Sequence, residues 1–253
     1  GDGDLDLVSG NLGRSGRPLT LYRNTGGTFE TDPSWSSRDS LRTHAIALGD
    51  VDGDGRLDLV CGTFGQGLRV YRNEGRAFGV DPVWANHTEN FAESLVLGDL
   101  DGDGDLDLVV GNMSQGNALY LSTGSGFADL SAWRSAPTDR TWSVVLADVN
   151  GDGALDLICG NAQQSENLYL NEGIFFSETP SWSWDAGGRV ASVALADVDG
   201  DGAPDLLAGS LDSGNAFFRN QNGAFPAAPT WRSNRNDRTR SVAAADLNGD
   251  GRP

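Results

Sequence analysis

The sequence predicts an all-β fold: a β-propeller of four-stranded blades, most simply with five of them. Three observations lead to this. An acidic motif recurs every 49 residues, starting at Asp50, Asp99, Asp148, Asp197 and Asp246. Tryptophans keep the same interval, at Trp35, Trp84, Trp133, Trp182 and Trp231. Short apolar runs alternate with glycine-rich turns, and no window has a sustained helical period. A repeat of about 40–50 residues that contains four short strands is typical of a propeller blade.

The strands can be placed in order within residues 41–89. The first is the apolar run AIALGD at 45–50, and the acidic loop joins it to LDLVCG at 57–62. LRVYRN at 68–73 alternates apolar and polar residues, and a fourth short stretch runs from Phe78 to Trp84. The same pattern predicts further blades at 90–138, 139–187 and 188–240. The repeated tryptophan is expected to pack between neighbouring blades, because it would bury a large apolar area there.

The two ends of the chain predict a composite blade within a single domain, 1–253. Residues 1–8 match 53–60, so the chain starts inside an acidic loop, and it ends inside another copy of that loop. Residues 1–40 and 241–253 would then form the first blade together, with 241–247 as its inner strand. The alternative is that five repeats belong to a longer array, such as a seven-bladed propeller. Without an initiator Met or a signal peptide, the chain is expected to be a mature or excised domain.

Composition excludes some classes of protein. The formal net charge is −18, from 36 acidic and 18 basic residues, and so acidic a chain is a poor candidate for binding nucleic acid. No apolar run is long enough to span a membrane. Cys61 and Cys159 occupy the same repeat position two repeats apart and are expected to be buried, unpaired thiols.

The acidic motif predicts Ca²⁺ sites, about five in all, one in each repeat. Oxygen donors at motif positions 1, 3, 5 and 9, with glycine at 6, resemble the first half of an EF-hand loop, and position 7 offers its backbone carbonyl. Hard oxygen donors without His or Cys favour Ca²⁺ over zinc or copper. The predicted ligands in the complete motifs are Asp50, Asp52, Asp54, Arg56 and Asp58; Asp99, Asp101, Asp103, Asp105 and Asp107; Asp148, Asn150, Asp152, Ala154 and Asp156; and Asp197, Asp199, Asp201, Ala203 and Asp205. The composite site would take Asp246, Asn248, Asp250 and Arg252 from one end and Asp6 from the other.

Two recurring stretches, ALGDVDGDGRLDLVCG and VYRNEGRAF, give the chain a resemblance to the FG-GAP/VCBS repeat family along nearly its whole length. These are the calcium-binding repeats of integrin-α-type propellers and of many bacterial secreted proteins. The resemblance implies a propeller fold, bound Ca²⁺ and a place outside the cell or at its surface. It implies no single function, because such propellers serve in adhesion, in lectins, as accessory domains of enzymes and in some lyases.

The loops opposite the acidic motifs are the candidate ligand face, because their residues differ from repeat to repeat while the scaffold repeats. The loops entering each first strand carry Arg42, His44, Arg140, Trp142, Arg189, Arg238 and Arg240. The loops between second and third strands carry amides and an acid, among them Asn112, Gln163, Gln164 and Asp212. These groups suit a sugar, a carboxylated glycan or an acidic protein loop.

Two functions stay open at this stage. The first is an extracellular binding or adhesion module for a glycan or a protein. The alternative is the propeller domain of a polysaccharide-acting enzyme, such as a lyase, or of a protein associated with one. No catalytic residues are predicted, since the two histidines lie in different repeats and no nucleophile motif is present.

Overall fold

The computed structural model describes residues 3–13, 15–87, 91–136, 139–173, 175–235, 237–249 and 251–253. Within these ranges the regular structure is entirely β, with no helix. The chain divides into two compact units. The first contains Gly1–Leu97, Asp105–Val110 and Leu119–Ser131, and the second contains Gly98–Gly104, Gly111–Ala118 and Ala132–Pro253.

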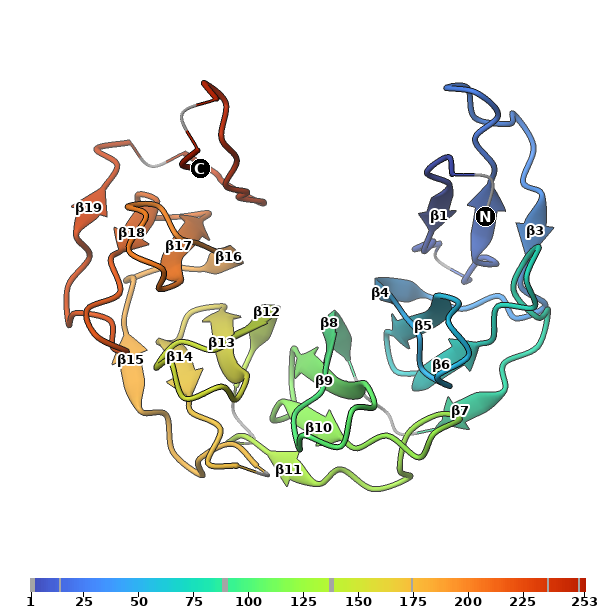
Figure 1. Ribbon diagram of the computed structural model, residues 1–253, viewed down its shortest axis with the longest axis horizontal. Helices are drawn as coiled ribbons and strands as arrows, with labels where there is room; N and C mark the ends of the chain where they lie inside the picture. The colour runs from blue at the N-terminus through green and yellow to red at the C-terminus, as the bar shows by residue number, and fades with distance from the viewer. Residues whose placement is uncertain are drawn as a thin grey trace. The chain divides into compact units, whose positions relative to one another are not determined.

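The strands form five sheets, each made of neighbours in sequence (Figure 1). The first sheet has three strands, β1 (Leu7–Ser9), β2 (Thr20–Tyr22) and β3 (Trp35–Ser36). The second has β4 (Thr43–Gly49), β5 (Asp58–Thr63), β6 (Leu68–Tyr71) and β7 (Trp84–Asn86). The third has β8 (Ala92–Gly98), β9 (Asp107–Asn112), β10 (Ala118–Tyr120) and β11 (Trp133–Arg134). The fourth has β12 (Thr141–Ala147), β13 (Asp156–Asn161), β14 (Glu166–Tyr169) and β15 (Trp182–Trp184). The fifth has β16 (Val190–Ala196), β17 (Asp205–Ser210), β18 (Ala216–Phe218) and β19 (Trp231–Arg232).

This arrangement confirms the predicted fold class and most of the predicted strand order. The first two strands of the second sheet pair antiparallel from Thr43 opposite Thr63 to Gly49 opposite Asp58, within two residues of the expected bounds. The fourth strand differs, because it begins at Trp84. Phe78 instead bridges Asn73 across the intervening turn, so this turn is closed by a single backbone pair before the chain reaches β7.

The repeated tryptophans pack against the aromatic residues of the next sheet. Trp133 at β11 meets the rings of Tyr169 and Phe176 edge-on, with centroids 5.2 and 5.1 Å apart. Trp35 packs in the same way on the second sheet, inside an apolar cluster that includes Leu59. The predicted role of the tryptophan between blades is therefore confirmed in these repeats. Trp231 differs, since 56% of it is exposed.

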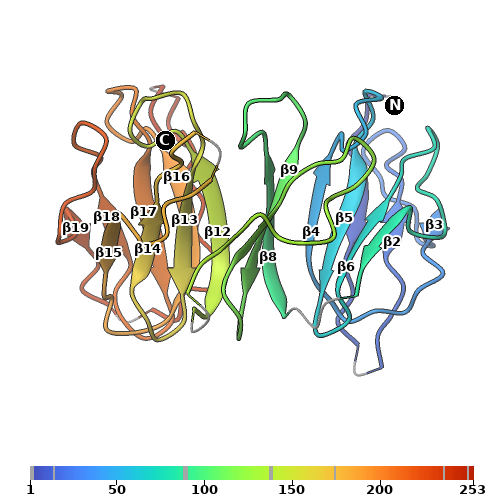
Figure 2. The same ribbon diagram turned by 90° about the horizontal axis from the view of Figure 1, so that it is seen from below.

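The hairpin order places the acidic loops and the variable loops at opposite ends of each sheet. In the second unit, the strands of the fourth and fifth sheets run alongside one another and their loops gather at two ends (Figure 2). The acidic loops join the first and second strands at one end. The loops between second and third strands, and those that enter the next first strand, lie at the other end.

The ends of the chain leave the composite blade a prediction. The first sheet has three strands, and residues 241–247 form no strand in the described part of the chain. Cys61 and Cys159 are buried free thiols, as expected. Burial raises the pKa of the Cys61 thiol to about 12, so this thiol stays protonated and unreactive.

Candidate metal centres

Each described acidic loop curls around the aspartate at position 1. In the second sheet, the carboxylate of Asp50 accepts the backbone N–H of Asp54 at 3.0 Å and that of Gly55 at 2.8 Å. Gly53 and Gly55 have φ of 72° and 84°, values that a residue without Cβ adopts readily. The loop therefore turns at the glycine of position 4 as well as at the glycine of position 6, which alone was predicted to do so.

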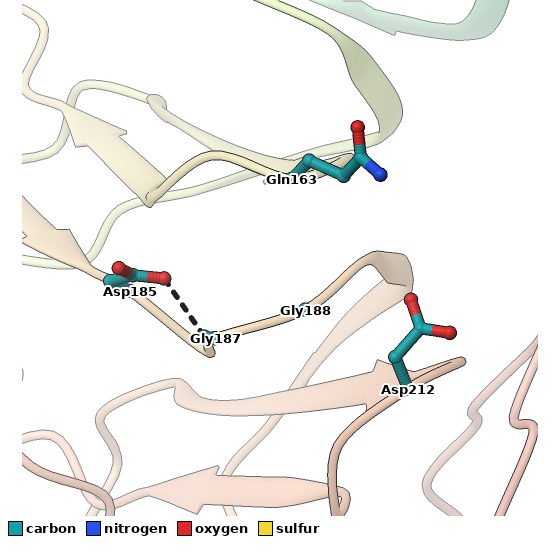
Figure 3. A pocket seen from close by; sticks show the side chains of 5 residues that line it. All are labelled: Gln163, Asp185, Gly187, Gly188 and Asp212. Atoms are coloured by element: carbon teal, nitrogen blue, oxygen red, sulfur yellow. Dashed lines mark hydrogen bonds between the residues drawn. The ribbon is translucent and has the colours of Figure 1, made fainter.

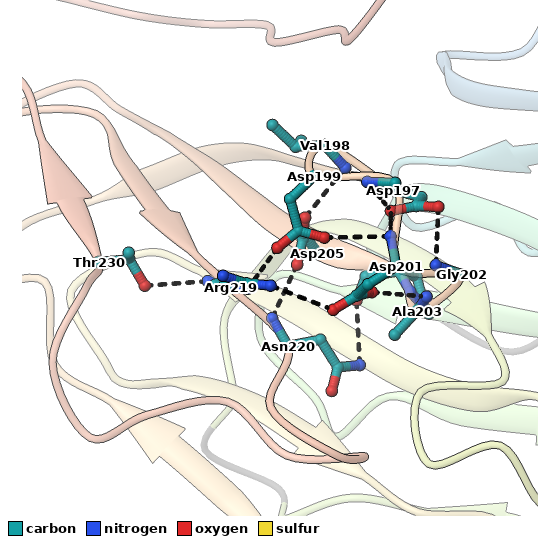
Figure 4. Close-up of polar contacts among 12 residues, drawn as sticks. Asp197, Val198, Asp199, Asp201, Gly202, Ala203, Asp205, Arg219, Asn220 and Thr230 are labelled. Carbon is teal, nitrogen blue, oxygen red and sulfur yellow. Dashed lines mark hydrogen bonds and ion pairs between the residues drawn. The ribbon is translucent and has the colours of Figure 1, made fainter. Parts of the chain in front are cut away.

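The same cradle is built in later repeats. Asp148 accepts N–H groups from Gly151, Asp152 and Gly153 at 2.7–3.0 Å. Asp197 accepts the three equivalent groups at 2.7–3.0 Å (Figure 4). Asp99 and Asp246 each accept the N–H groups of the glycines at positions 4 and 6. Hydrogen bonds to the position 1 carboxylate therefore curve the loop.

The aspartate at position 9 is buried where the second strand begins. Asp58 accepts the backbone N–H groups of Val51 and Asn73, at 3.2 and 2.7 Å. Asp156 and Asp205 each accept the two equivalent groups at 2.8–2.9 Å. These bonds tie the loop to the second strand and to the turn after the third strand.

Burial raises the pKa of the carboxyls of Asp58, Asp156 and Asp205, because their charged forms lose solvation. The backbone hydrogen bonds act in the opposite direction, and neighbouring loop carboxylates add a further upward contribution. A buried carboxylate beside others of the same charge is stabilised by a bound cation.

Positions 1, 3 and 9 converge in three of the loops. Their carboxylate oxygens can lie within 4.8 Å of one another in Asp50, Asp52 and Asp58; in Asp99, Asp101 and Asp107; and in Asp197, Asp199 and Asp205. In the fourth repeat Asn150 stands at position 3 and donates its amide to Asp152 at 2.8 Å. Converging hard oxygen donors fit a Ca²⁺ ion, to which these side chains would contribute their carboxylates.

The position 5 and position 7 residues lie on the exposed side of the loops. Asp152 and Asp201 accept the backbone N–H of Ala154 and Ala203, at 2.9 and 3.0 Å. These hydrogen bonds lower the pKa of both carboxyls. Arg56 at position 7 forms an ion pair with Asp54 and donates to the Asn73 carbonyl. Asp103 and Asp105 are exposed in the third loop.

The predicted ligands at the two chain ends are only partly placed. Asp6 accepts the backbone N–H of Asn24 at 2.9 Å, the same role that Asp58 has toward Asn73. Asn248 donates its N–H to Asp246 at 3.2 Å, and Arg252 is exposed. Asp250 lies outside the described residues. A site shared by the two ends stays a prediction.

On the opposite loops, several predicted ligand-face residues contact neighbouring side chains. His44 hydrogen-bonds Glu93 at 3.0 Å and stacks on Phe64, whose ring also lies 4.6 Å from the Arg42 guanidinium. Arg189 forms a bidentate salt bridge with Asp212, with Nε–Oδ2 and Nη2–Oδ1 distances of 2.6 and 2.7 Å.

The other predicted ligand-face residues make fewer side-chain contacts. Arg189 also lies 5.9 Å from the Trp142 ring centroid. The Arg140 backbone donates to Gln164 at 2.9 Å. Arg238 and Arg240 are exposed.

Comparison with known proteins decides the family. The FG-GAP-like repeat matches five times, at residues 1–61, 50–110, 99–159, 148–208 and 197–253. The chain belongs to the FG-GAP-like repeat family. No curated protein sequence matches it.

Solved structures share the fold of these FG-GAP-like repeats at low identity. The Vibrio cholerae biofilm matrix protein Bap1 is 20% identical with a TM-score of 0.60, over 93% of this chain and 37% of that one. BBS1N, in complex with ARL6DN and soaked with mercury, is 12% identical with a TM-score of 0.55, over 85% of this chain and 62% of that one. The chain therefore spans less than two thirds of the length of either of these two proteins.

The FG-GAP-like repeats differ from one another in one way that sequence reasoning missed. Arg219, after β18, forms ion pairs with Asp199 and Asp201 in the fifth loop (Figure 4). Arg72 pairs with Asp52 at 2.5 Å in the second loop. Leu121 and Leu170 occupy the equivalent positions in the third and fourth repeats. At this position after the third strand, two repeats therefore have an arginine paired with the acidic loop and two have leucine.

Proposed function

We propose that this chain is a Ca²⁺-stabilised binding module of an extracellular or cell-surface assembly. The observation that carries the proposal is the repeated carboxylate triad, in which positions 1, 3 and 9 lie within 4.8 Å around a preformed backbone cradle. A dication at each triad offsets the repulsion that several close carboxylates create in a chain of formal charge −18.

The extracellular placement implies weak calcium sites. Extracellular calcium modules bind with dissociation constants of about 10⁻⁴–10⁻³ M, so calcium outside cells fills them and cytosolic calcium does not. The fold shared with a biofilm matrix protein is consistent with a role in adhesion. Among the described residues there is no helix that could cross a membrane.

The binding role rests on the loops opposite the calcium centres. Their residues vary between repeats, whereas the acidic loops and the tryptophans repeat. The ligand would be a glycan or a protein, and the net negative charge argues against nucleic acid.

Two measurements test the proposal. Calcium titration by calorimetry should show several ions bound per chain, and a binding screen on glycans and matrix proteins in millimolar Ca²⁺ should give a ligand that EGTA releases. A chain that binds no calcium at millimolar concentrations contradicts the proposal. The enzyme alternative is tested with the same polysaccharides, because a lyase would generate unsaturated, ultraviolet-absorbing products.

A further inference from the structure

The loops of the fourth and fifth sheets are joined differently at the two ends of these sheets. At the end with the variable loops, Gln163, Asp185 and Asp212 line a pocket of about 350 Å³ (Figure 3). At the acidic end, a buried asparagine bridges the loops. This residue, Asn220, follows β18 and is 1% exposed. All four residues belong to the second compact unit.

Asn220 makes one hydrogen bond toward each of two acidic loops. Its backbone N–H donates to Asp205, the position 9 aspartate of the fifth loop, at 2.8 Å (Figure 4). Its side-chain amide donates to the carbonyl of Val149 in the fourth loop, also at 2.8 Å. That carbonyl belongs to the peptide bond that joins Val149 to Asn150. One residue therefore contacts a predicted ligand of the fifth centre and the backbone beside a predicted ligand of the fourth.

The turn that follows Asn220 holds its side chain in this orientation. The side-chain oxygen accepts the backbone N–H of Gly223 at 2.9 Å, and the amide nitrogen also donates to the Pro204 carbonyl at 3.2 Å. Gly223 packs so closely on the fourth loop that a Cβ there would lie 2.9 Å from the Asn150 Cα. The turn after β18 and the fourth acidic loop are therefore in direct contact, so a backbone shift in one displaces the other.

The same bridge joins the third and fourth loops. Asn171 donates its backbone N–H to Asp156, at position 9 of the fourth loop, and its side-chain amide to the Leu100 carbonyl in the third loop, both at 2.8 Å. Asn171 is buried, so breaking its side-chain bond would leave an amide without a water partner. The free energy of the bridge therefore depends on the conformation of both loops.

The third repeat has a serine at the bridging position. Ser122 keeps the backbone hydrogen bond, to Asp107 at 2.8 Å. Its hydroxyl accepts the N–H of Gly124 at 3.1 Å. Ser122 and the second acidic loop both belong to the first compact unit, and among the described residues no hydrogen bond joins them. The second and third loops are therefore a natural comparison pair without an asparagine bridge.

We propose that Asn171 and Asn220 are positioning residues that make calcium binding cooperative among the third, fourth and fifth loops, while the second loop binds independently of the third. An ion that orders one loop fixes the group to which the asparagine is bonded, so the next loop has less conformational freedom to lose. A buried hydrogen bond of this kind changes an equilibrium constant about threefold. This inference rests on the proposed calcium-stabilised function and specifies how its centres are linked.

The test is a double-mutant cycle read by nuclear magnetic resonance during calcium titration. The backbone amide of Gly202, which donates to the position 1 aspartate, reports the fifth loop. Arg219 pairs with two carboxylates of this loop, so the fifth loop is expected to fill after the fourth. Asp152→Ala removes a predicted ligand from the fourth loop and should raise the Gly202 midpoint about threefold. In an Asn220→Ser background, the same substitution should change this midpoint by less than about 1.5-fold.

Asn73→Ser is the matched control. The Asn73 amide donates to the Leu57 carbonyl of its own loop at 3.0 Å, and the described residues show no bond from it to another acidic loop. In this background, Asp152→Ala should still raise the Gly202 midpoint about threefold.

Ser122→Asn tests the inference by adding a bridge. The backbone amide of Gly55 reports the second loop. Asp103→Ala, which removes a predicted ligand from the third loop, should leave the Gly55 midpoint unchanged in the natural sequence. In the Ser122→Asn background it should raise that midpoint about threefold. This gain is measurable even if Asn220→Ser does not fold.

Three results would overturn the inference. Equal shifts at Gly202 with and without Asn220→Ser would mean that Asn220 supports the fold without linking the loops. A Gly202 midpoint that falls in Asp152→Ala would mean that repulsion between neighbouring ions outweighs the bridge. An unchanged Gly55 midpoint in Ser122→Asn with Asp103→Ala would reject the asparagine as the linking group. Calcium still binds in all three cases, so the proposed function would stand, whereas loops that bind no calcium would overturn both.

Discussion

Replacing Arg219 with leucine should strengthen calcium binding by the fifth loop. Arg219 pairs with the carboxylates of Asp199 and Asp201, which are predicted ligands. The substitution copies the fourth repeat, where Leu170 holds the same position. The guanidinium is 48% exposed, so a water-like dielectric applies, and a unit charge about 5 Å from a dication is then repelled by roughly 1.5 kcal/mol. We expect the dissociation constant of this loop to fall about 5- to 30-fold.

A site-specific readout is needed because the repeats bind the same ion. The backbone amide of Gly202, which donates to Asp197, reports the fifth loop by nuclear magnetic resonance during a calcium titration. Gly153 reports the fourth loop and should keep its midpoint within about twofold. Arg235→Leu removes an equal charge from a side chain that is 84% exposed and pairs only loosely with Asp237, so it is the matched control.

A weaker fifth site in Arg219→Leu would refute this reasoning. It would mean that the guanidinium holds the two carboxylates in place for the ion instead of competing with it. An unchanged midpoint at Gly202, with calcium shown to bind there, would equally exclude the competition.

Three further outcomes are expected. Trp133→Ala should lower the free energy of unfolding, measured by urea titration, by about 3–5 kcal/mol, because the buried ring packs on Tyr169. Trp231→Ala, at a 56% exposed site, should change the same free energy by less than about 1 kcal/mol. Raising the pH from about 6 to about 8 in saturating calcium should lower the free energy of unfolding by roughly 2–3 kcal/mol. The pKa of buried Glu166 is raised to about 8, so the stability that its neutral form contributes is lost as the pH rises toward that value. A Glu166→Gln variant with the same pH dependence would contradict this. EGTA should lower the melting temperature well below its value in millimolar Ca²⁺, since each site at ten times its dissociation constant adds roughly 1.4 kcal/mol; a melting temperature indifferent to EGTA would show that calcium does not stabilise the fold.

Most of the fold followed from features that are local in sequence. The 49-residue period and the runs of alternating residues fix four strands per repeat, because strand pairing in a hairpin depends on neighbours in the chain. The acidic motif was readable for the same reason, since all nine positions of the loop are contiguous. The fourth strand was less well placed, because the bridge between Asn73 and Phe78 depends on turn geometry.

The side-chain ion pairs at the acidic loops and at the opposite loops could not be predicted from the sequence. Arg219 follows β18, whereas Asp199 and Asp201 lie before β17. Nothing in the sequence around Arg219 distinguishes it from a solvated arginine. Arg189 was expected to reach a ligand, and its bridge to Asp212 spans two loops. Such contacts depend on which loops the sheet brings together, and the repeat spacing does not determine the rotamers of long side chains.

The arginines beside the second and fifth loops have a consequence for the chain without metal. Close carboxylates repel one another, and a counter-charge within the chain reduces that repulsion. Arg72 and Arg219 supply such a charge to the second and fifth loops, whereas the third and fourth repeats have Leu121 and Leu170 at the same position. Removal of divalent ions should therefore loosen the third and fourth loops more than the second and fifth, so the repeats would differ in stability although their acidic motifs are nearly the same.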